Sequence, residues 1–248
     1  MFIDNWIDGP EKIRVLSNYL YICKNKPKMD YLLKRSLWVA GLATLFLILA
    51  ISCKKESKEE TETIIAPEAI DLGLSVKWGS FNLGATSPEQ IGNLYAWGET
   101  ETKKKYTWGN YEHGNSNYIR KYNGQDGKVV LDPEDDVAQM KLGGKWRMPT
   151  AEEAKEFWDK CSFRWVNEGN RHGVLVTSTL NGNSIFLPAA LVIVGAQTWY
   201  EQWYWTASYD NAINGITFSC GERHDLLFGA GNGKLKYEGL AIRPVYAD

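Results

Sequence analysis

The chain has few of the side chains on which metal binding and nucleophilic catalysis depend. It contains 3 His and 4 Cys in 248 residues. His113, His172 and His224 are not spaced as metal ligands, and none stands in a His/Cys cluster of the zinc type. We therefore expect no metal and no cofactor, and interpret the histidines as solvated or hydrogen-bonded side chains.

A basic stripe is also missing, which argues against nucleic acid as a partner. After Cys53 the sequence has 21 Lys+Arg and 26 Asp+Glu. The glycine-rich run 229–233 lacks the Lys-Ser/Thr of a phosphate loop and predicts a turn. The acidic run 132–136 lacks the alternating ligands of a calcium loop, and instead predicts the capped start of a short helix at Val137.

The longest apolar run, Leu37 to Ile51, is too short to span a bilayer comfortably. As a helix it would cover about 22 Å, against roughly 30 Å of hydrocarbon. Lys34-Arg35 precedes it and Ser52-Cys53 follows it, the order of a bacterial lipoprotein export signal. The cleavage region resembles a lipobox, whose cysteine receives a diacylglycerol, so Cys53 is the predicted lipidation site. The alternative is an uncleaved membrane anchor.

This signal divides the chain. Residues 1–28 are interpreted as a gene-model extension or a cytoplasmic lead, with translation expected to start at Met29, and residues 29–52 as the signal peptide. Residues 53–65 read as a flexible charged tether, and 66–248 as one folded domain. The predicted location is the outer membrane, with a lipid-anchored domain that faces the periplasm or the cell surface.

Only Cys161 and Cys220 remain as thiols beyond the lipidation site. Outside the cytoplasm such a pair can oxidise. A disulfide closing this loop would stabilise the domain by roughly 4 kcal/mol in the chain-entropy model. The sequence leaves open whether they form this disulfide or stay separate buried thiols.

The clearest local signal is a helix start. Thr150 is a candidate N-cap, and Glu153 follows three residues later, as in a capping box. Apolar residues then recur at helical spacing, which predicts a helix from Ala151 to about Cys161. Residues 75–81 alternate as a half-buried strand does, and 100–126 read as a long surface excursion. Further short strands are predicted at 163–166, 173–177, 184–187, 203–207, 215–219, 225–228 and 240–245, which gives an α+β class.

Eight short motifs occur in the order of one known family. They are 68–78, 82–85, 87–89, 95–99, 144–150, 183–189, 204–208 and 242–245. Together they resemble the Fibrobacter succinogenes major paralogous domain, common in exported lipoproteins of gut Bacteroidetes. One departure is Tyr204-Trp-Thr-Ala-Ser208, where the family usually has Tyr-Trp-Ser-Ser.

The resemblance implies a C-type lectin-like fold, with curled antiparallel sheets, one or two helices and long loops. It also implies a distant relation to formylglycine-generating enzymes, but Cys161 and Cys220 do not stand in that enzyme's copper motif. The lectin calcium motifs Glu-Pro-Asn and Trp-Asn-Asp are absent, so calcium-dependent sugar binding of that kind is not expected.

The densest aromatic cluster runs from Trp199 to Trp205. Tyr204 and Trp205 are expected in the core, as the resemblance implies. Trp199, Tyr200 and Trp203 are candidate ligand-facing aromatics, which could stack on sugar rings beside Glu201 or Gln202. Ordinary packing is the alternative.

Two arginines flank prolines in the family motifs. A buried arginine needs an acidic partner, so Arg147 and Arg243 are predicted to form structural ion pairs with Asp135, Asp136 or Glu99. The sequence does not choose among these acids.

The predicted function is non-catalytic binding or adhesion at the cell envelope, with a glycan or an extracellular protein as ligand. One alternative is a carbohydrate-active or oxidase-like enzyme. A glycosidase would need two facing carboxylates, for which Glu99, Glu101 and Asp210 are available. The other alternative is a structural subunit of a surface assembly.

Overall fold

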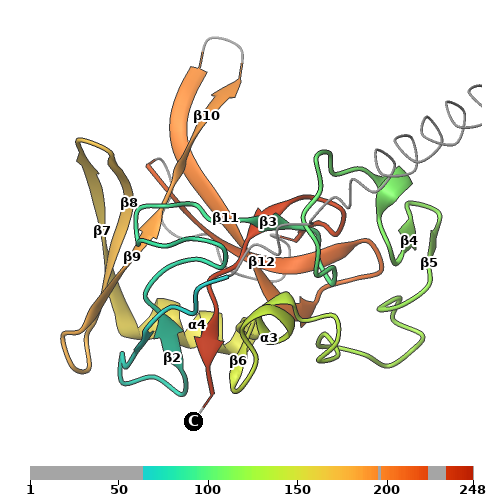
Figure 1. Ribbon diagram of the computed structural model, residues 1–248, viewed down its shortest axis with the longest axis horizontal. Coiled ribbons are helices and arrows are strands. Elements are labelled where there is room, and N and C mark those ends of the chain that lie inside the picture. Colours follow the sequence, from blue (N-terminus) through green and yellow to red (C-terminus); the bar gives the residue numbers. More distant parts are fainter. Residues whose placement is uncertain (1–63, 195–196, 223–232, 248) are drawn as a thin grey trace, which may run out of the picture. The chain divides into compact units, whose positions relative to one another are not determined.

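The computed structural model describes residues 64–194, 197–222 and 233–247. The described part is mostly strands, with the two α-helices α3 (Val137–Leu142) and α4 (Ala151–Lys160), which agrees with the α+β class (Figure 1). None of its helices combines the length and the apolar character needed to cross a membrane. Residues 1–63, and with them Cys53, lie outside the described residues, as do His224 and the strand predicted at 225–228.

The described strands form four sheets, and all their pairings are antiparallel except that of β11 with β14. The largest sheet has the order β13 (Lys234–Leu235), β12 (Asn214–Gly221), β11 (Gln197–Tyr209), β14 (Leu240–Ala241) and β3 (Leu94–Tyr95), with β10 (Ala190–Val194) paired to β11. The second has the order β1 (Ala69–Ile70), β2 (Lys77–Gly79), β15 (Val245–Tyr246) and β6 (Trp146–Arg147). The other two are β7 (Cys161–Glu168), β8 (Arg171–Ser178) and β9 (Ser184–Pro188), and the pair β4 (Gly114–Asn115) and β5 (Tyr118–Ile119).

Strand β11 separates two hydrophobic clusters. Successive side chains of a strand point to opposite faces. Tyr204 accordingly packs in the first cluster, while Trp205 and Ala207 pack in the second. Both Tyr204 and Trp205 are completely buried, so the core placement expected for them is confirmed. The strand is therefore the central element of the domain.

Helix α4 begins as its sequence predicts. The Thr150 hydroxyl accepts from the Glu153 N–H, and the Glu153 carboxylate accepts from the Thr150 N–H, which completes the capping box. This satisfies N–H groups that have no partner within the helix. The helix buries Ala154 and Phe157, and the Phe157 ring stacks on Trp78 with 4.2 Å between centroids.

The long excursion between β3 and α3 is confirmed. Residues 100–126 contain only the 3-10 turn η1 (Trp108–Asn110) and the β4–β5 pair. Tyr122 fixes this excursion to the body of the domain, because its side chain is completely buried and its hydroxyl donates to the Asp135 carboxylate at 2.6 Å. Packing also begins before residue 66, the predicted start of the domain. Ile64, which the sequence assigned to the tether, packs against the second cluster.

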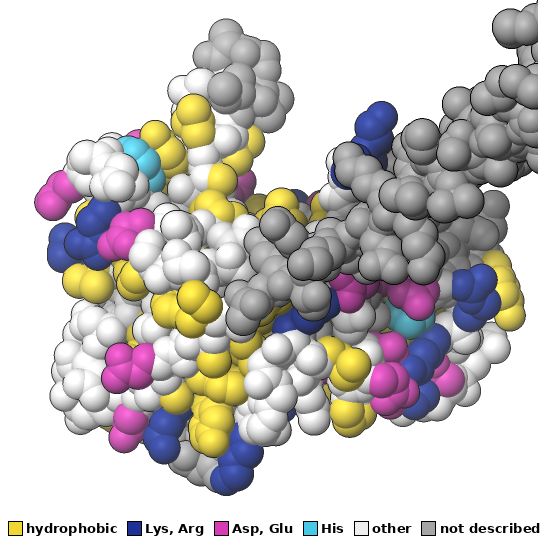
Figure 2. Space-filling model, viewed as in Figure 1, with side chains coloured by type: hydrophobic (Ala, Val, Ile, Leu, Met, Phe, Trp, Pro, Cys, Tyr) yellow, Lys and Arg dark blue, Asp and Glu magenta, His cyan; other side chains and the backbone are white. Residues whose placement is uncertain are grey.

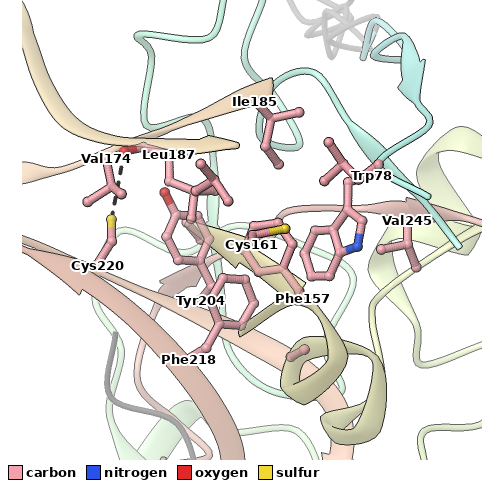
Figure 3. Packing of buried hydrophobic residues seen from close by; sticks show 14 of the residues in the cluster. Trp78, Phe157, Cys161, Val174, Ile185, Leu187, Tyr204, Phe218, Cys220 and Val245 are labelled. Atoms are coloured by element: carbon pink, nitrogen blue, oxygen red, sulfur yellow. Dashed lines mark hydrogen bonds between the residues drawn. The ribbon is translucent and has the colours of Figure 1, made fainter. Parts of the chain in front are cut away.

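The possible disulfide between Cys161 and Cys220 is absent. Both are free, buried thiols of the first cluster, and Figure 3 shows their sulfur atoms well apart. The Cys220 thiol instead points at the carbonyl oxygens of Leu187 and Pro188, at 3.7 and 3.8 Å. The structure therefore has the other arrangement that the sequence left open, two separate thiols within the core.

Candidate functional site

A solvent-open pocket of about 210 Å³ lies between the excursion and the turn that joins β11 to β12. One wall comes from residues 116–125, and the other from Ala212 and Ile213. Tyr118 and Ile213 are unusually exposed for apolar side chains, at 67% and 38%. The lining contains no carboxylate, imidazole, thiol or cation, and consists of Ser116, Asn117, Tyr118, Ile119, Asn123, Gln125, Ala212 and Ile213.

Two side-chain-to-backbone turns shape the first wall. The Asn115 carboxamide oxygen accepts from the N–H groups of Asn117 and Tyr118, at 2.9 and 3.1 Å. The Asn123 oxygen accepts in the same way from Gln125 at 2.8 Å. Such Asx turns fix the backbone locally. The side-chain amides of Asn117 and Gln125 have no hydrogen-bond partner among the described residues and stay available to a ligand.

Lys236 ties the two walls together. Its side chain is completely buried, and its ammonium donates to the carbonyl oxygens of Tyr122 at 2.8 Å and Ala212 at 2.9 Å. The ammonium also lies over the rings of Trp97 and Tyr209, 4.8 and 4.7 Å from their centroids. Burial lowers the pKa of Lys236 to about 8. These contacts fix the position of the Lys236 side chain between the two walls of the pocket.

The candidate aromatics of β11 do not share one face. Trp199 and Trp203 lie on the side of Glu201, and Tyr200 lies on the other. The Trp199 Nε1–H donates to Glu201 at 3.0 Å, and the Lys234 ammonium lies 4.1 Å from the Trp203 ring centroid. All three rings are partly exposed. As ligand-facing residues they stay a prediction, but they do not form a single flat platform.

Tyr200 takes part in a separate contact with the β7–β8 hairpin. The His172 ring stacks on it at 4.0 Å and 14°, and His172 Nδ1 lies 2.6 Å from the Asn167 carboxamide oxygen. The nearby β10–β11 hairpin projects from the body of the domain and carries apolar side chains (Figures 1 and 2), among them Leu191 at 51% exposure.

The other described histidine is structural. His113 is buried, and its Nε2 lies 2.7 Å from the Gly98 carbonyl oxygen. Within the described residues no group of three or more metal-ligating side chains is assembled.

The predicted arginine ion pairs need correction. Arg147 does form one, but its partner is Glu153, with 2.7 Å between Nη1 and Oε2. The capping-box carboxylate therefore serves both the helix start and the arginine. Burial raises the pKa of Glu153, but hydrogen bonds from Arg147 and Thr150 outweigh it, so the pKa is lowered overall.

Asp135 and Asp136 have other roles. Asp136 caps α3 by accepting from the N–H groups of Ala138 and Gln139, and it also accepts from Met148. Burial raises its pKa despite these bonds. Asp135 binds the Lys121 ammonium at 2.6 Å. The short capped helix predicted after the acidic run is confirmed.

For Arg243 the predicted ion pair is wrong. The side chain is completely buried, and its guanidinium donates to the carbonyl oxygens of Gly79 at 2.8 Å and Phe186 at 2.7 Å. No carboxylate among the described residues pairs with it. Burial lowers its pKa. The planar guanidinium thus joins two backbone segments, and its hydrogen bonds to their carbonyl groups take the place of the expected ion pair.

The groups considered for catalysis are separately engaged. Glu99 is buried and pairs with Lys103, Glu101 pairs with Lys141, and Asp210 accepts from the Asn211 amide at 2.9 Å. Burial raises the pKa of Cys161 to about 11 and that of Cys220 to about 12. Both thiols therefore stay protonated at neutral pH, which removes their nucleophilic form.

Comparisons with protein-family models, with curated proteins and with solved structures give no match to this chain.

Sequence reasoning missed the pocket. Its walls are about 90 residues apart in the sequence, and only the fold brings them together. The available signal was local: a tyrosine in a run rich in Asn, Ser and Gln, within residues 100–126, which the sequence predicts to be a surface excursion.

Proposed function

We propose that this protein is an exported, lipid-anchored protein of the cell envelope whose domain binds a ligand without catalysis. The observation that carries this proposal is the open, uncharged pocket. Small-molecule sites are concave, with apolar walls and a few placed polar groups. The lining has no carboxylate, imidazole, thiol or amine, and its two hydroxyl groups, on Ser116 and Tyr118, have no general base among the lining residues to activate them.

The envelope location rests on the sequence around Cys53. A cleaved, lipidated cysteine followed by a charged tether would hold the domain near the outer membrane, facing the periplasm or the cell surface. Labelled palmitate should enter the wild-type protein and not the Cys53→Ser variant. Recovery of the wild-type protein from cytosol with residues 29–52 still attached would contradict this location.

The eight motifs support the same proposal. Their order resembles the Fibrobacter succinogenes major paralogous domain and favours a C-type lectin-like arrangement of the strands. The α+β content and the long excursion are compatible with that arrangement. The resemblance supports a glycan or an extracellular protein as the ligand.

A structural subunit of a surface assembly is a second candidate, favoured by one feature. Strand β10 pairs with β11 along one edge, and its other edge has no strand partner among the described residues. Free edges of this kind can accept a strand from another chain. For the enzyme alternative, by contrast, the pocket lining provides no pair of facing carboxylates.

The test uses the full chain purified in micelles of a polyoxyethylene detergent, which has no sugar headgroup. It is applied to an array of glycans and extracellular proteins, and the bound material is analysed by mass spectrometry. We expect saturable binding with no product, weakened in Tyr118→Ala and kept in Leu180→Ala. Leu180 is a matched control because it is exposed at 55% on the turn between β8 and β9. Product formation, or no binding at all, would contradict the proposal.

A further inference from the structure

The chemistry of the pocket lining restricts what the pocket can hold. Its side chains are carboxamides, a hydroxyl, a phenol and aliphatic groups, all uncharged at neutral pH. A charged ligand group would lose hydration there without gaining a counter-charge, which is unfavourable. A purely apolar ligand would leave the carboxamides of Asn117 and Gln125 unpaired. The lining therefore favours a neutral ligand that has both polar groups and an apolar face.

The size of the pocket agrees with one six-membered ring. Its volume is about 210 Å³, and a cavity of roughly 150 Å³ already admits benzene. The opening to solvent would let a longer chain continue outward from that ring. A single residue of a polymer, rather than the whole polymer, matches these dimensions.

The apolar contacts come from opposite walls. Tyr118 stands on β5 and is mostly exposed, and Ile213 stands in the β11–β12 turn and is exposed over about a third of its surface. The C–H face of a sugar ring can lie against a phenol ring while its hydroxyls point to the edges. The free carboxamides lie on either side of Tyr118 in the sequence, and each supplies donors and an acceptor.

Hydrogen bonds within the domain itself hold both walls of the site. The Asx turns at Asn115 and Asn123 hold the first wall, and the second is held by the backbone bond from Lys236 N–H to the Ile213 carbonyl oxygen at 3.0 Å. The Lys236 ammonium links the two walls through Tyr122 and Ala212. Preorganisation of this kind reduces the entropy lost on binding.

We propose that this pocket is a subsite for one neutral pyranose residue of a glycan. Tyr118 and Ile213 would contact the apolar face of the ring, and the carboxamides of Asn117 and Gln125 would hydrogen-bond its hydroxyls. This inference rests on the proposed binding function, which it narrows from glycan or protein to a neutral sugar.

The test compares neutral and acidic oligosaccharides on the full chain in the same sugar-free micelles, using saturation-transfer NMR and competition titrations. Neutral hexose oligosaccharides should bind, and those ending in a uronic or sialic acid should bind about tenfold more weakly or not at all. Tyr118→Ala should weaken binding about tenfold, whereas Tyr118→Phe, which keeps the ring, should bind nearly as wild type. Gln125→Glu places an unpaired charge in the site and should also weaken binding of neutral sugar.

Controls separate this site from the aromatics of β11. Trp199→Ala and Leu180→Ala should leave sugar binding unchanged, and thermal unfolding should show that each variant is folded. Equal binding by wild type and a folded Tyr118→Ala variant would overturn the subsite, as would loss of binding in Trp199→Ala alone or a preference for acidic sugars. Binding of an extracellular protein but no sugar would overturn the subsite and leave the proposed function standing. A wild-type chain that binds nothing would overturn both.

Discussion

The ammonium of Lys236 lies 2.8 Å from the carbonyl oxygen of Tyr122, and both side chains are completely buried. The lysine forms no ion pair among the described residues, and Asp126 and Asp210 affect it only by longer-range attraction. Two carbonyl oxygens and two aromatic rings take the place of a counter-ion. The buried ammonium thus links the two walls of the pocket without a carboxylate as its hydrogen-bond partner.

This arrangement predicts a pH dependence of stability. Lys236 has a pKa of about 8 in the folded protein, against 10.5 for the free side chain. Between these values the unfolded chain holds the proton and the folded one does not, so the free energy of unfolding should rise with pH. The rise attributable to Lys236 should be on the order of 1–3 kcal/mol.

Lys236→Met is the matched variant for that measurement. Urea unfolding at pH 8, 9 and 10 should show the wild-type free energy rising relative to that of the variant. The comparison between the two proteins removes the contributions of the tyrosines that they share. Parallel curves for the two proteins would show that Lys236 does not titrate in this window.

The capping box of α4 gives a second prediction. Thr150→Ala removes the hydroxyl that accepts from Glu153 N–H, and should lower the free energy of unfolding by about 1 kcal/mol. Thr102→Ala, at an exposed position in the excursion, is the control and should change it little. Equal effects of the two substitutions in urea unfolding would argue against the cap.

The hydrogen bonds of Arg243 give a third prediction. Arg243→Lys keeps the charge but loses the fork that joins Gly79 and Phe186. It leaves at least one buried carbonyl unpaired, which should cost roughly 1–3 kcal/mol. Arg164→Lys, on an exposed position of β7, should have almost no effect. A stability of Arg243→Lys equal to that of wild type would mean that a single ammonium suffices there.

The two thiols give a fourth. Because Cys161 and Cys220 are buried and burial raises their pKa values to about 11 and 12, iodoacetamide should label them slowly in the native protein and rapidly in urea. Peptide mapping by mass spectrometry follows each site. A disulfide-linked peptide that joins the two residues in protein isolated under non-reducing conditions would contradict the separate thiols.

Local features were predictable because they depend on near neighbours. The Thr150–Glu153 box, the Asp136 cap and the opposite orientations of Tyr204 and Trp205 all follow from spacing along the chain. Each of these patterns depends on residues within a few positions of one another, so it can be recognised without knowing the tertiary fold.

Partners chosen by the tertiary fold were not predictable in the same way. Arg147 is an exception, because its partner Glu153 lies only six residues later, and the sequence pattern indicated Glu153 only as part of the capping box. Arg243 is satisfied by carbonyl groups of two distant segments, which no charge pattern in the sequence could indicate. The pocket likewise needs two loops that are far apart in the sequence and a buried lysine between them.

The most direct test of the central claim is a ¹H–¹⁵N NMR titration of the full chain in sugar-free micelles with a neutral oligosaccharide that binds it. The account predicts that shifts concentrate on the backbone amides of Tyr118 and Ile213 and on the side-chain amides of Asn117 and Gln125. Shifts confined to the β10–β11 hairpin around Trp199 would contradict it, because the ligand would then bind away from the uncharged pocket.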